Sequence, residues 1–131
     1  MKLIEIIAAK PALQRLTETR FKNFSVARNL MSLRKAVDSE LSFYSAEQRK
    51  IALSYAVLNE AGNPVFIDAQ HIRLKDETSK AAFDAEMQAL REMEVNITPV
   101  PVLETDFRNP DDFPSPDDML ALDGLVAFEE A

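Results

Sequence analysis

The feature that most restricts the fold is an apolar repeat between residues 25 and 58. Its large apolar side chains lie three, four or seven positions apart, and they are Val26, Leu30, Leu33, Val37, Leu41, Tyr44, Ile51, Tyr55 and Leu58. This spacing is typical of one face of an α-helix, and it predicts a helix of about 33 residues, about 50 Å long, with Ser25 as its N-cap. Such a helix is longer than a small domain is wide. We therefore expect a bend near Ser42–Ser45, a partner that covers part of the helix, or a helical hairpin formed within one chain.

Shorter patterns around this repeat predict a mostly α, α+β fold. Residues 2–20 indicate a helix that is broken near Pro11, because proline lacks the N–H of an interior helical residue. A cluster of turn residues followed by short apolar runs predicts a small β-hairpin over 59–76. Residues 78–94 have helical periodicity, and residues 95–103 alternate around two prolines, which indicates an edge strand.

The chain has 131 residues, the size of one domain, and its charge is unevenly distributed. Residues 1–58 carry 10 basic and 5 acidic side chains, whereas residues 104–131 carry 1 and 9. We expect a helical core over 1–103 and an acidic, proline-rich linker that leads into a short C-terminal docking helix over 104–131. Ser115 and Pro116 have the residue types of a helix start, and the apolar residues of 119–128 need a surface to pack against.

The charge pattern and the apolar end of the chain together predict a surface for a partner. Basic residues of the long helix could attract the acidic end of the chain, in the same molecule or in a neighbouring one, and both alternatives stay open. The residues that we expect to bind a partner are Arg28, Arg34, Lys35, Phe107, Phe113, Met119, Leu122 and Leu125.

Composition argues against most catalytic and metal chemistries. The chain has no cysteine, one histidine and two glycines, which excludes thiol chemistry, sites with several histidines and glycine-rich phosphate loops. Asp68 and His71 have the spacing of a weak acid–base pair, but no nucleophile or second acid accompanies them, so a surface histidine is the favoured interpretation. We expect no enzyme activity, no cofactor and no metal. The negative net charge of −7 does not favour direct nucleic-acid binding.

The order of segments resembles a family of short phage and prophage proteins that is known as a domain of unknown function. The resemblance covers most of the chain and is clearest in the segments Ser25–Leu30, Phe83–Met87, Glu94–Ile97 and Ser115–Asp123. It implies a phage origin and no enzymatic activity.

These observations together predict a non-catalytic phage protein that acts by protein–protein contact, as a virion or assembly component. Its partners would be other phage proteins or further copies of itself, in the host cytoplasm or in the virion, without a membrane. The alternative is a host-directed inhibitor of a defence or regulatory protein, which could use its acidic end as a nucleic-acid mimic.

Overall fold

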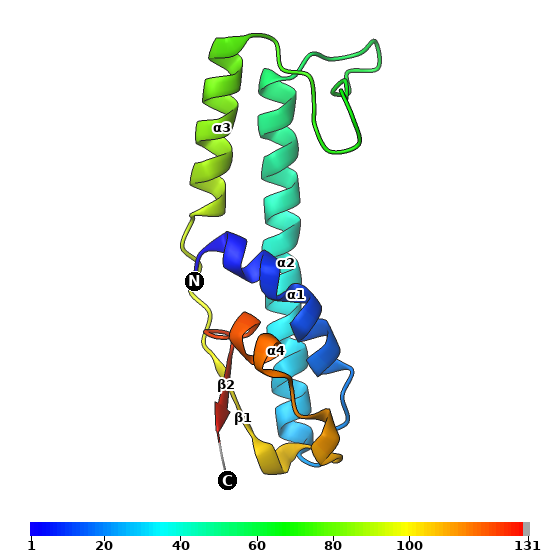
Figure 1. Cartoon of the computed structure of the whole chain (residues 1–131), viewed down its shortest axis with the longest axis vertical. Coiled ribbons are helices and arrows are strands. Elements are labelled where there is room, and N and C mark those ends of the chain that lie inside the picture. The colour runs from blue at the N-terminus through cyan, green and yellow to red at the C-terminus, as the bar shows by residue number, and fades with distance from the viewer. Residues whose placement is uncertain (130–131) are drawn as a thin grey trace. The chain divides into compact units, whose positions relative to one another are not determined.

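The computed structural model describes residues 1–129, which form a mostly α, α+β fold (Figure 1). Its elements are α1 (Leu3–Thr17), α2 (Phe24–Tyr55), α3 (Glu77–Arg91), β1 (Val100–Leu103), the short 3₁₀ turns η1 (Glu104–Asp106) and η2 (Pro110–Asp112), α4 (Pro116–Ala121) and β2 (Val126–Glu129).

The chain divides into two compact units. Unit 1 consists of Met1–Leu41 and Glu94–Ala131, and unit 2 consists of Ser42–Met93, so α2 contributes to both. The division that we predicted between residues 103 and 104 falls inside unit 1, because β1 before it and β2 after it pair with each other.

The long helix is present, and it is continuous through residues 42–45, where we considered a bend. It begins two residues earlier than predicted, at Phe24, because Asn23 rather than Ser25 supplies the capping oxygen. The side-chain Oδ1 of Asn23 accepts the backbone N–H of Ser25 at 3.0 Å.

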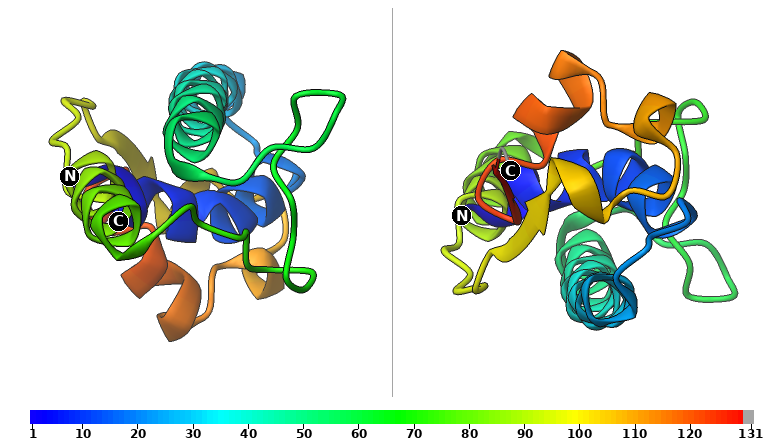
Figure 2. Two further views of the ribbon diagram at one scale, coloured as in Figure 1. Left: turned by 90° about the horizontal axis from the view of Figure 1, so that it is seen from above. Right: turned by 90° about the horizontal axis from the view of Figure 1, so that it is seen from below.

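α1 is the central helix of unit 1. Two further views show it between the first part of α2 and α4 (Figure 2). The break that we predicted near Pro11 is wrong, since α1 continues through this residue. Its buried side chains come from both sides of the proline, and they are Leu3, Ile6, Ala9, Ala12, Leu13 and Leu16. Burial of this whole face outweighs the one hydrogen bond that the proline removes.

The C-terminal segment belongs to the core of unit 1. We predicted a helix through Phe128, and the second half of that prediction is wrong, because α4 ends at Ala121 and β2 follows. Gly124 turns the chain with a positive φ of 87°, a conformation that glycine adopts without strain. The turn places Leu122 and Leu125 in the core, where neither side chain is accessible to solvent.

The two strands form a parallel pair in which Val100 lies opposite Val126 and Leu103 lies opposite Glu129. The Val100 N–H donates to the carbonyl of Leu125 at 3.0 Å, so the backbone N–H of Val100 faces β2. The backbone nitrogen of the next residue, Pro101, faces away from β2, and proline carries no N–H there. The N–H of Leu103 also points away, and it donates to the buried carboxylate of Asp106 at 2.8 Å.

A row of four phenyl rings packs together in unit 1. Ring centroids are 5.0 Å apart between Phe21 and Phe107, 5.3 Å between Phe107 and Phe113, and 5.8 Å between Phe113 and Phe128. These spacings are those of favourable aromatic pairs. Phe107 and Phe113 are therefore packing residues here and not free contact residues.

In unit 2, the second part of α2 and α3 are joined by a folded loop over residues 56–76. The hairpin that we predicted over 59–76 is reduced to single antiparallel bridges, which pair Ala56 with Leu74, Leu58 with Pro64, and Phe66 with Ile72. The loop reverses direction twice in a short stretch, so no pairing continues long enough to make a strand.

A closed set of backbone hydrogen bonds nevertheless fixes this loop. The N–H of Val57 donates to the carbonyl of Arg73 at 2.8 Å, that of Arg73 donates to Val65 at 2.7 Å, and that of Val65 donates back to Val57 at 2.8 Å. We call this set the 57–65–73 ring. It joins the three passes of the chain through the loop, so the loop has a defined backbone although it has no strand.

Candidate functional site

Unit 2 has very few buried side chains. Among the residues that the structure describes in Ser42–Met93, those that are buried are Ala56, Met87 and Leu90. The second part of α2, from Ser42 to Tyr55, contains no buried residue among those described, although its apolar repeat continues through Tyr44 and Ile51. A unit of this size normally needs its own hydrophobic core. Much of the apolar surface of unit 2 therefore stays exposed or half-exposed.

An open groove of about 1190 Å³ lies between the two helices and the loop of unit 2. α2 contributes Arg49 and Ala52 to its lining, the loop contributes Phe66 and Ile72, and α3 contributes Phe83. Small-molecule pockets usually measure about 300–1,000 Å³ and enclose most of their ligand. The size and openness of this groove suit the side chains of a protein partner better.

The rim of the groove carries two adjacent, strongly exposed apolar side chains. Phe66 is 62% exposed and Ile67 is 70% exposed. They lie at the last turn of the loop, which the bridge between Phe66 and Ile72 closes, and we call residues 66–72 the tip. Adjacent large apolar side chains exposed at the end of a loop, beside an apolar groove, are typical of an interaction surface.

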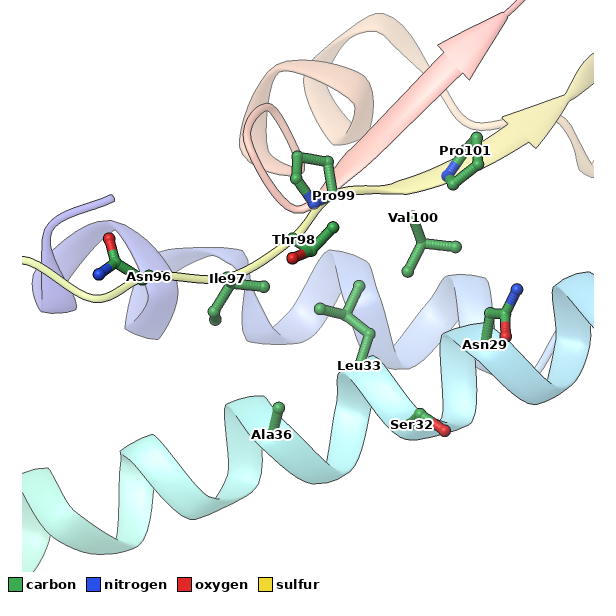
Figure 3. Close-up of a pocket in the computed structure, with 10 residues that line it drawn as sticks. All are labelled: Asn29, Ser32, Leu33, Ala36, Asn96, Ile97, Thr98, Pro99, Val100 and Pro101. Atoms are coloured by element: carbon green, nitrogen blue, oxygen red, sulfur yellow. The ribbon is translucent and has the colours of Figure 1, made fainter.

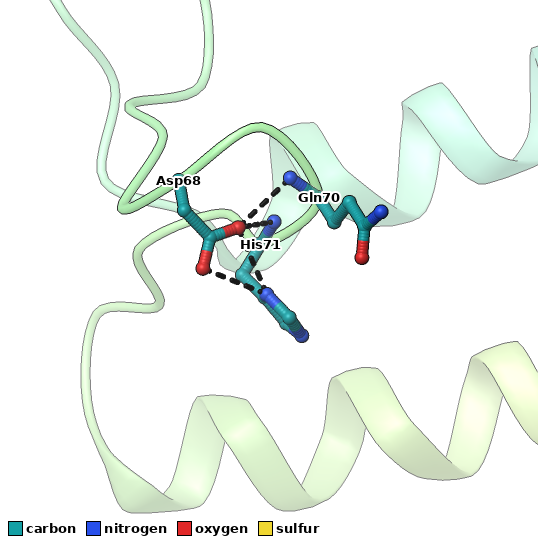
Figure 4. A network of polar contacts seen from close by, with 3 residues as sticks. All are labelled: Asp68, Gln70 and His71. Carbon is teal, nitrogen blue, oxygen red and sulfur yellow. Dashed lines mark hydrogen bonds and ion pairs between the residues drawn. The ribbon is translucent and has the colours of Figure 1, made fainter.

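A polar network stabilises the turn within the tip (Figure 4). Oδ1 of Asp68 accepts the backbone N–H groups of Gln70 at 2.8 Å and His71 at 2.9 Å, and Nδ1 of His71 lies 2.9 Å from the same oxygen. The Gln70 N–H foremost, and then the His71 side chain, lower the pKa of the Asp68 carboxyl. The carboxylate is therefore the stable form, and it orders the loop directly behind Phe66 and Ile67.

The Asp68–His71 pair is a turn-stabilising contact in this setting. Both side chains are mostly exposed, at 57% and 71%, and the hydrogen-bonded partners of the pair are the backbone groups of the same turn. Within residues 1–129, no group of three or more histidine, cysteine, aspartate or glutamate residues is placed to hold a metal ion. The geometry therefore shows how the turn is fixed.

Charges of both signs line the groove. Arg49 donates to the side-chain amide of Asn63 at 3.3 Å, which fixes the guanidinium against the loop. Lys80 and Asp84 lie on the α3 wall. In the described part of the chain, Arg49 and Lys80 have no carboxylate within 4.0 Å, and Asp84 has no cation within that distance. The groove therefore offers unpaired charges of both signs to a partner.

The structure does not bring the predicted contact residues together on one surface. Phe107, Leu122 and Leu125 are at most 2% exposed, so they are core residues of unit 1 and their assignment to a partner surface is corrected. Phe113 and Met119 are half-buried. The predicted basic residues lie on the first part of α2, namely Arg28, Arg34 and Lys35.

The acidic segment pairs with a different cation from those we expected. Asp118, in the first turn of α4, forms an ion pair with Arg15 of α1, and this contact within the chain fixes the start of α4. Its hydrogen bond with Arg15 lowers the pKa of the Asp118 carboxyl. Arg34 instead donates to the hydroxyl of Thr17 at 3.0 Å.

Phe66 and Ile67 are the exposed apolar residues of the groove rim that sequence reasoning missed. They were assigned to one strand of a hairpin, in which alternate side chains would face a core. The signal that could have found them is the run Val65-Phe66-Ile67, three consecutive apolar residues between a turn cluster and a polar turn.

A second, smaller groove of about 510 Å³ lies in unit 1, between α2 and residues 96–101 (Figure 3). Leu33 points toward this segment, while Ile97 and Val100 point toward the helix. The residues that line it are all uncharged. It therefore offers no titratable group for acid–base chemistry and no charged ligand for an ion.

The search for similar proteins found no match to the chain among family models, curated proteins or solved structures. Within the described residues, none of the helices combines the length and the apolar character that crossing a membrane requires.

Proposed function

We propose that this is a non-catalytic, phage-encoded protein that acts by protein–protein contact, as a virion or assembly component in the host cytoplasm or the virion. The observation that carries the proposal is the uncovered apolar surface of unit 2, formed by the tip and the groove beside it. The phage origin rests on the resemblance in segment order.

The energetic argument concerns Phe66 and Ile67. Burying a large apolar side chain contributes roughly 1.5–3 kcal/mol relative to leaving it exposed. Both side chains are more than half exposed in a loop whose backbone is already fixed by the 57–65–73 ring and the Asp68 network. A partner that covered them would gain this burial with little further loss of backbone entropy, which is the property of a prepared binding surface.

Residue-specific photocrosslinking in the producing cell tests the proposal. A benzophenone amino acid would replace Phe66 in one variant and Phe24 in the control. Phe24 is 77% exposed and lies in unit 1, outside the lining of the groove. We expect light-dependent protein adducts from position 66 and few from position 24.

The identity of the adduct separates the possible partners. Another virion protein, or a second copy of this chain, fits the assembly component, whereas a host defence or regulatory protein would indicate an inhibitor that uses the same surface. If position 66 gives no more protein adducts than position 24, the surface is not a contact site and the proposal fails.

A further inference from the structure

We infer that the partner of the unit 2 surface is a second copy of this chain, and that two such surfaces pack against each other around a two-fold axis. The inference rests on the proposed function, because it names the occupant of the same surface.

The first argument is that unit 2 needs a partner from the time it folds. With Ala56, Met87 and Leu90 as the buried residues described in unit 2, most apolar side chains of its helices and loop stay partly in water. A folding partner must be present wherever the chain is made, and another copy of the chain always meets this condition. Units that cannot build a sufficient core commonly gain it by oligomerisation.

The second argument is that the surface carries both a projection and a groove. Phe66 and Ile67 are strongly exposed at the rim, and the groove that they help to line extends to α2 and α3. In a two-fold dimer the same surface of each subunit contacts the other, so each projection meets the groove of its partner. A surface that contained only a projection or only a groove would need a different molecule as its complement.

The third argument is electrostatic. Arg49 and Lys80 are unpaired cations in the described chain, and Asp84 is an unpaired anion on the same groove. When two copies of a surface with both signs of charge face each other around a two-fold axis, cations of one can lie against anions of the other. A nucleic acid or a partner of one charge sign would leave part of this groove repelled.

Sedimentation equilibrium of the purified full-length chain tests the inference. We expect twice the mass of one chain at micromolar concentrations. Phe66→Asp should raise the dimer dissociation constant by at least about 30-fold, because it removes an apolar side chain that the dimer would bury and adds a charge to the contact. Phe24→Asp is the matched control, and it should leave the dissociation constant within about 2-fold, because this side chain is exposed outside the groove. Circular dichroism is the folding control, and we expect both variants to keep their helices.

A single-cysteine probe tests which surface is in contact. The native chain contains no cysteine, so Ile67→Cys introduces one unique attachment point for a benzophenone-maleimide. In a mixture of ¹⁴N and ¹⁵N copies, we expect mixed-isotope crosslinks from position 67 to residues 45–52 or 77–84. Leu120→Cys in unit 1 is the control, and it should not crosslink to these residues.

The outcomes separate this inference from the proposed function. A purified chain that is monomeric up to about 100 μM overturns the inference, as does a dimer that Phe66→Asp and Phe24→Asp weaken equally. Adducts to a different protein at position 66 in cells, with a monomeric purified chain, would sustain the proposed function and reject the second copy. A monomeric chain without adducts at position 66 would reject both.

Discussion

Replacing Leu122 with alanine tests whether the C-terminal segment is part of the core. Leu122 follows α4 directly and its side chain is 0% exposed. Removing a fully buried leucine side chain typically costs about 2–5 kcal/mol, as lost transfer free energy and as the cavity that remains. The total stability of a domain is about 5–15 kcal/mol, so Leu122→Ala should remove a large fraction of it. The assay is urea denaturation followed by circular dichroism, read as the shift of the midpoint at constant m-value.

The control is Leu120→Ala, the same substitution two residues earlier. Leu120 is 77% exposed, and we expect a change within about 0.5 kcal/mol, as for most surface positions. Equal and small changes for both variants would refute the reasoning, because the segment would then be a peripheral tail that contributes little to unit 1.

Four other predictions follow from local geometry. Pro11→Ala should stabilise the chain, by up to about 3 kcal/mol in denaturation experiments, because Pro11 is exposed and its replacement restores a helical hydrogen bond; destabilisation would contradict this reasoning. Arg15 lowers the pKa of Asp118, so the stabilisation from this pair should be complete above the ordinary aspartate pKa of about 3.9 and lost as the pH falls through the lowered value. An NMR titration should show the Asp118 midpoint rising in Arg15→Ala, and an unchanged midpoint would exclude the pair in solution. His71→Ala should change the free energy of unfolding by less than about 1 kcal/mol in a urea titration, because the His71 side chain is exposed. A larger loss would show that the tip depends on the His71 imidazole. The amides of the 57–65–73 ring should exchange with deuterium more slowly than the other amides of the loop, and uniform fast exchange would show that the ring does not persist.

Local patterns made the helices predictable. The long helix was predicted because its apolar positions repeat over many turns, and its observed range of 32 residues, Phe24–Tyr55, is close to the predicted one. The start of α4 was predicted because the signal lies in adjacent residues. Ser115 accepts the backbone N–H of Asp118 at 3.2 Å, and Pro116 occupies the first turn.

Long-range packing determined what the sequence did not reveal. The apolar end of the chain fits a helix or a strand equally well by pattern, and pairing with β1, which lies far earlier in the chain, selects a strand for β2. The same limit applies to the site. Whether Phe66 and Ile67 face a core or solvent depends on how the loop folds against the two helices, and no local pattern contains that information.

The outer edge of β1 has a consequence for aggregation. An exposed strand edge with free N–H groups can be extended by a strand from another chain, and such growth leads to fibres. At this edge Pro101 has no N–H, and the N–H of Leu103 is already bound by Asp106, a carboxylate that is only 7% exposed. An incoming strand would therefore find no donor along β1. A buried carboxylate and a proline thus protect this edge of a short sheet from fibre growth.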